Sequence, residues 1–146
     1  KQYTSYVGIK FQVEGYTLTA REDTIKVEVY GYTFKMPITQ AAAKMWYDAN
    51  QSEELSFEAE GGKSEDIKVW ANFPFSYTDI KYFSTNNAEK WFSIYRNQND
   101  AIKDGDNYYY LFYIKTEANT EEERSGSVYV ALKNKTEITL RILTIQ

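Results

Sequence analysis

Apolar and polar side chains alternate along most of the chain, and a period of two is typical of β-strands with one buried face. In the first such segment Val7, Ile9, Phe11 and Val13 share one face. The alternating segments in the first forty residues are 7–13, 16–20, 25–29 and 32–38. They predict three or four antiparallel strands joined by tight turns.

Residues 39–52 break this alternation. They contain helix-forming residues such as the run Ala41–Ala43, and Thr39 is a possible N-cap. We therefore expect a short helix or linker here, with Met45 and Trp46 docking it onto a sheet. This segment is also the best internal boundary in the chain.

Alternation resumes after residue 53, in the segments 55–59, 67–71, 91–95, 108–116, 127–133 and 137–145. Many short strands separated by turns are typical of a β-sandwich. The sequence predicts an all-β protein with an N-terminal β unit over residues 1–52 and a β-sandwich over residues 53–146. In the last segment the apolar parity changes after Ile142, which predicts a β-bulge there.

Composition narrows the chemistry available to the chain. It has no Cys and no His, which excludes thiol nucleophiles, disulfides, Cys/His zinc sites and His-based catalytic triads. Two carboxylates are enough for a glycosidase, but nothing in the distribution of the 21 acidic residues indicates a catalytic pair. We expect no enzymatic activity, no catalytic residue and no cofactor.

Charge and hydropathy limit the partners. The net charge of −4 and the absence of a basic cluster argue against nucleic acid. No apolar run reaches the length of a membrane span. The oxygen-rich loops 97–100 and 104–107 lack the spacing of an EF-hand, so we expect polar turns and no metal site.

Several landmarks in residues 54–146 occur in an order that resembles a BACON domain, a Bacteroidetes-associated module. The most specific are the stretch from Asn119 to Val130 and the closing Leu143-Thr144-Ile145-Gln146. The others are Leu55-x-Phe57-x-Ala59-x-Gly61-Gly62, Ile67-x-Val69-x-Ala71-Asn72-x-Pro74-Phe75 and Trp91-Phe92-Ser93-Ile94. The segments before Trp91 and before Tyr108 are longer than in that family, and residues 1–52 have no family match.

The resemblance implies an immunoglobulin-like sandwich on an exported Bacteroides-type lipoprotein, located in the periplasm, at the outer membrane or on the cell surface. The family is associated with carbohydrate-active proteins, which implies a polysaccharide or a mucin-type glycan as partner. The alternative is a structural spacer or a protein-interaction module within a surface complex.

Aromatic residues make up 17% of the chain, and parity divides them between core and surface. In residues 108–114, Tyr110 and Phe112 share a face with Tyr108 and Ile114, whereas Tyr109 and Tyr113 lie on the other face. By the same reasoning Trp70 and Tyr129 point outward. The candidate ligand-binding residues are Trp70, Tyr109, Tyr113 and Tyr129.

Sugar rings stack on exposed aromatic rings, so Tyr109, Tyr113 and Tyr129 are candidates for a single flat platform. Tyr also packs well on any half-buried sheet surface, and residues 1–52 are able to cover this face. Trp91, at a family landmark, is expected in the core. Asp23-Thr24-Ile25 matches the Asp-Thr-aliphatic pattern of Bacteroidetes O-glycosylation, with a simple turn-to-strand transition as the alternative.

Overall fold

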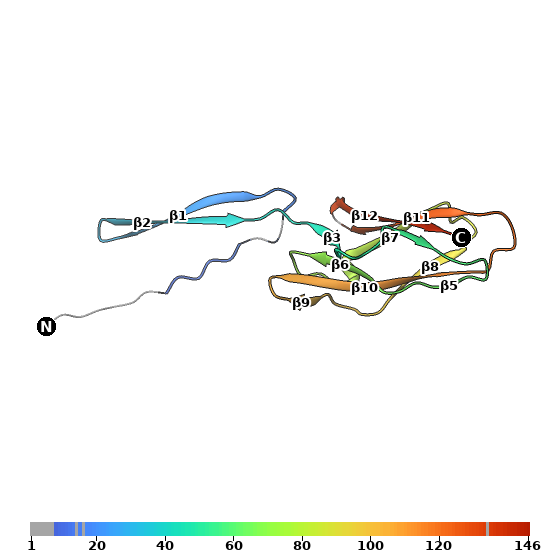
Figure 1. Ribbon diagram of the computed structural model, residues 1–146. Coiled ribbons are helices and arrows are strands. Elements are labelled where there is room, and N and C mark those ends of the chain that lie inside the picture. Colours follow the sequence, from blue (N-terminus) through green and yellow to red (C-terminus); the bar gives the residue numbers. More distant parts are fainter. Residues whose placement is uncertain (1–7, 14, 16, 134) are drawn as a thin grey trace.

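The computed structural model describes residues 8–13, 15, 17–133 and 135–146, apart from the side chains of residues 135–137. Strands dominate these residues, and the helical element among them is the 3-10 turn η1 (Tyr77–Asp79). The strands form three sheets, as Figure 1 shows. The all-β prediction is confirmed.

Two of the sheets face each other as a β-sandwich, and β10 is the main strand of the first. In that sheet β3, β6, β10 and β5 are neighbours in this order, and β8 and β9 also pair with β10. The second sheet has the order β4-β12-β11-β7. The bounds of the first are β3 (Met45–Tyr47), β5 (Gly62–Lys63), β6 (Ile67–Ala71), β8 (Phe92–Arg96), β9 (Ile102–Asp104) and β10 (Asn107–Thr116). Those of the second are β4 (Glu54–Ser56), β7 (Ile80–Thr85), β11 (Ser125–Leu132) and β12 (Lys135–Ile145).

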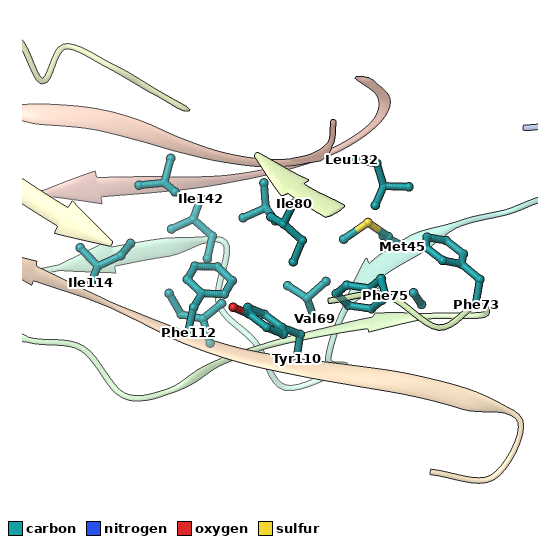
Figure 2. Packing of buried hydrophobic residues seen from close by; sticks show 14 of the residues in the cluster. Met45, Val69, Phe73, Phe75, Ile80, Tyr110, Phe112, Ile114, Leu132 and Ile142 are labelled. Carbon is teal, nitrogen blue, oxygen red and sulfur yellow. The ribbon is translucent and has the colours of Figure 1, made fainter. Parts of the chain in front are cut away.

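The core lies between these two sheets and is rich in aromatic rings (Figure 2). Tyr110 and Phe112 of β10 are fully buried, as the alternation predicts. Phe112 contacts Tyr82 of β7 across the sandwich, with 5.6 Å between ring centroids. Trp91 is buried, as expected. The core between the sheets therefore combines fully buried aromatic rings with aliphatic side chains.

The helix expected within residues 39–52 is absent, and that prediction is wrong. Met45–Tyr47 form β3, which pairs with β6 so that Met45 lies opposite Ala71 and Trp46 opposite Trp70. Met45 is buried while Trp46 is half-buried, which is the alternation of a strand. Cross-strand pairing with β6 outweighs the weak helix propensity of the alanines before it.

The third sheet is a hairpin of β1 (Arg21–Val29) and β2 (Tyr32–Gln40) that projects away from the sandwich (Figure 1). Its strands are in register from the pair Arg21–Gln40 to the pair Val29–Tyr32. Tyr30 and Gly31 form the turn with φ of 48° and 79°, the two positive values that a tight hairpin turn requires. The strands expected over 7–13 and 16–20 are not formed in the residues described there, 8–13, 15 and 17–20.

The predicted β-bulge near Ile142 is also wrong. Ile142 and Thr144 are both buried, so the inward parity of β12 continues through Thr144, while Leu143 and Ile145 are half-buried on the other face. The register irregularity lies instead between Ala131 and Leu132, at the β11–β12 turn. β12 pairs with β11 on one side and with β4 on the other, and its register with β11 is continuous from Thr139 to Ile145.

Candidate functional site

Three aromatic side chains form a row across the outer face of the first sheet. Trp46 of β3 lies opposite Trp70 of β6, and Trp70 lies opposite Tyr109 of β10. The Trp70 and Tyr109 rings meet edge to face, with centroids 5.3 Å apart and planes at 62°. All three side chains are half-buried. We call Trp46, Trp70 and Tyr109 the aromatic row.

A carboxylate is fixed at the margin of this row. The indole Nε1–H of Trp70 donates to Oδ1 of Asp48 at 2.8 Å. This bond lowers the pKa of Asp48, and the Asn50 amide and the charge of Lys68 lower it further. The pairing of β3 positions Asp48, because its backbone N–H donates to the Lys68 carbonyl at 3.1 Å. The row thus has an ionised hydrogen-bond acceptor held beside its central ring.

Lysines lie over the faces of these rings. The Lys68 ammonium is 4.4 Å from the ring centroids of both Trp70 and Tyr109. The Lys44 ammonium is 5.3 Å from the centroid of Trp46. A cation over an aromatic face is attracted by the negative face of the ring. The row therefore combines apolar ring area, one carboxylate and two cationic groups.

Tyr113 belongs to the same face but to a second aromatic pair. It follows Tyr109 by four positions on β10 and stacks on Tyr95 of β8, with centroids 5.3 Å apart and planes at 14°. Lys63 lies over Tyr113 at 4.0 Å and Lys115 over Tyr95 at 5.2 Å. Residues four apart on a strand are separated by about 13 Å, so the two pairs occupy separate places along one surface.

Tyr129 is separated from the other candidates. It lies on β11 in the second sheet, where it stacks on Phe83 of β7 with centroids 4.8 Å apart and planes at 5°. Outward residues of the two sheets of a sandwich lie on opposite sides of the molecule. The expected platform of Tyr109, Tyr113 and Tyr129 is therefore not formed, although parity places each of them outward.

Trp46 is the member of the row that sequence reasoning missed. Its assignment to a helix hid its place beside Trp70. The signal available was the alternation Met45-Trp46-Tyr47, only three residues long.

Thr24, the candidate for O-glycosylation, lies on β1. It is exposed, as a modification site would require, and its backbone N–H donates to Oδ1 of Asp23 at 2.7 Å.

The polar loops serve the fold. Asn97 donates to the Asp66 carboxylate, and Gln98 donates to the Asp100 and Tyr109 carbonyls at 2.8 and 3.2 Å. Among the described residues no group of three or more acidic side chains is placed to hold a metal ion. The described chain also contains no helix with the length and apolar character of a membrane span.

Fold and surface together define a β-sandwich with an open aromatic face and a projecting hairpin. When the chain is compared with known proteins, no family model, no curated protein and no solved structure matches it. The resemblance of residues 54–146 to a BACON domain thus stays a prediction.

Proposed function

We propose that this chain is a non-catalytic glycan-binding module of an exported or surface-anchored protein. The observation that carries the proposal is the aromatic row, in which Trp46, Trp70 and Tyr109 are adjacent across three strands. Sugar rings present C–H faces that pack on indole and phenol rings, while their hydroxyls need fixed polar partners. The Asp48 carboxylate and the Lys68 ammonium supply an acceptor and a donor next to Trp70.

The same surface argues for binding without catalysis. The row lies on the outer face of a sheet, whereas a glycosidase holds the scissile bond between two carboxylates. The carboxylate of Asp48 accepts a hydrogen bond from Trp70, and its pKa is lowered. A lowered pKa suits a permanent acceptor and does not suit a general acid, which needs a raised pKa.

Affinity electrophoresis of the full chain in gels containing plant polysaccharides or mucin tests the proposal. Trp70→Ala should weaken binding at least tenfold, because it removes the central ring of the row. Tyr129→Ala is the matched control, since it removes an outward ring from the opposite sheet. Retardation of Trp70→Ala equal to wild type, or no retardation of the wild type by any glycan, would refute glycan binding at the row.

The projecting hairpin favours a second function, association through protein contacts. On one of its faces the pairs Ile25–Met36, Val27–Phe34 and Val29–Tyr32 are apolar. Phe34 is 61% exposed and Tyr32 is 71% exposed. A two-stranded hairpin is marginally stable alone in water, and a contiguous apolar patch marks an interaction surface. The opposite face carries Lys26 and Lys35, among other polar residues.

We propose a second copy of this chain as the occupant of that face, because the exposed apolar face of one hairpin is chemically matched by the same face of another. Sedimentation velocity over a concentration series should then show a monomer–dimer equilibrium. Phe34→Asp should shift it to monomer, while Lys35→Asp on the polar face should leave it unchanged. A wild-type chain that stays monomeric at every concentration, or a dimer insensitive to Phe34→Asp, contradicts this second function.

A further inference from the structure

The lysines on the aromatic face gather in a chain that is acidic as a whole. The net charge is −4. Nevertheless Lys68, Lys63 and Lys115 all lie over outward rings of the first sheet, at 4.4, 4.0 and 5.2 Å from the nearest ring centroids. Lys44 adds a fourth ammonium over Trp46. Positive charge is thus concentrated where the aromatic rings are.

Two of these lysines face each other across neighbouring strands. Lys63 of β5 is directly opposite Lys115 of β10 in the antiparallel register, so both side chains lie on the same face of the sheet. Like charges directly opposite one another destabilise a sheet. Within the described chain neither ammonium forms an ion pair, and each lies instead over one ring of the Tyr113–Tyr95 stack. An anion bound between them would relieve this repulsion.

The spacing of the two cationic places matches one extended ligand. Lys68 lies opposite Leu111, which is between Tyr109 and Tyr113 on β10. The charges therefore run along the same strand direction as the rings, over about 13 Å between Tyr109 and Tyr113. A short stretch of a chain-like ligand is long enough to reach both places.

We infer that the ligand of this face is an anionic glycan, one whose sugars carry carboxylate or sulfate groups. This inference rests on the proposed function, since the rings of the aromatic row supply the stacking. The anionic groups pair with Lys68 at the row and with the Lys63–Lys115 pair beside the tyrosine stack. Uronic acids and sulfated sugars share this chemistry.

The test compares polymers that differ in charge but share a backbone. Isothermal titration of the full chain with polygalacturonate and with its methyl ester covers carboxylates, and dextran sulfate with dextran covers sulfate. Wild type should bind the charged member of at least one pair ten or more times more tightly. Lys63→Gln/Lys68→Gln/Lys115→Gln should remove that preference and leave binding of the neutral member intact. Lys81→Gln, over Phe83 on the opposite sheet, is the control.

The outcomes separate the two proposals. Equal binding of charged and neutral polymers, lost in Trp70→Ala, leaves the glycan-binding function standing and overturns the preference for anions. Binding of polyglutamate as tight as that of polygalacturonate also overturns it, because the face would then recognise charge without sugar. No binding of any polymer overturns both proposals.

Discussion

Gly126 lies in β11 where the second sheet approaches Phe92 of the first. A Cβ at this position would be 2.7 Å from a ring carbon of Phe92 and 2.7 Å from the backbone oxygen of Thr85. Phe92 is itself buried, so its ring has little room to move. Gly126→Ala therefore adds one methyl group where neither neighbour yields easily, and it tests how closely the sandwich is packed.

The expected size of the effect is the difference of two terms. Overpacking a well-packed core by a methyl group costs about 1–3 kcal/mol. Replacing Gly by Ala within a strand returns roughly 0.5–1 kcal/mol, because the unfolded chain loses less conformational entropy. Since one of the two close contacts is backbone, we expect the packing term to dominate, with a net loss of roughly 1–2 kcal/mol.

Urea unfolding followed by circular dichroism measures this loss. With a slope of about 1–3 kcal/mol per M, the midpoint of Gly126→Ala should fall by about 0.3–2 M at an unchanged slope. Gly8→Ala, where a Cβ meets nothing within 4 Å, is the matched control. Combining Gly126→Ala with Phe92→Leu should cost less than the sum of the two single changes, because the smaller side chain makes room for the methyl group. A midpoint for Gly126→Ala at or above wild type refutes the reasoning.

Three further results are expected. Because the hydrogen bond from Trp70 lowers the pKa of Asp48, this bond stabilises the fold above the ordinary carboxyl pKa, and the stabilisation is lost as pH falls through the pKa of Asp48 in the folded protein. The NMR signal of the Trp70 indole N–H should therefore titrate with a midpoint below about 3.9, and Asp48→Asn should abolish this transition. Burial raises the pKa of Tyr110, so its contribution to the free energy of unfolding is fully present below about pH 10 and falls above it, by up to about 1.4 kcal/mol per pH unit. In urea titrations at alkaline pH, the stability of Tyr110→Phe should decline less steeply with pH than that of wild type, and an equally steep decline counts against this reasoning. Arg124 donates through Nη2 to Oε1 of Gln146 at 2.7 Å, and its guanidinium lies 4.7 Å from the centroid of the Trp91 ring. Arg124→Lys should therefore lower the free energy of unfolding by about 1–3 kcal/mol, and a change within about 0.5 kcal/mol would contradict the importance of the guanidinium.

The alternation of β10 was enough to predict which of its side chains face the core. In β10 it placed Tyr110 and Phe112 inside and Tyr109 and Tyr113 outside, because one face of that strand meets the second sheet. The parity of a strand predicts which of its side chains point into the core and which point outward, but it does not predict which sheet the strand joins. For this reason it did not separate Tyr129 from the residues of the aromatic row.

The candidate site was recovered only in part for a related reason. Trp46 joins the row through pairing with β6, a contact between residues 24 positions apart, in a strand too short to show its period. In β12, Thr144 is buried although its neighbours Leu143 and Ile145 are more hydrophobic and would be expected inside. The pairing of β12 with β11 and β4 fixes which face of the strand points inward, and the local hydropathy of the sequence does not predict it.

The place of β12 has a consequence for how the chain reaches this fold during synthesis. β12 lies between β4 and β11, and Leu143 pairs with Glu54 in the parallel part of that sheet. Until residues 135–145 have left the ribosome, β4 has no partner strand and one edge of β11 is open. Contacts this distant in sequence form late, so the second sheet of the sandwich stays incomplete until β12 has been synthesised, whereas every strand of the first sheet precedes it in the chain.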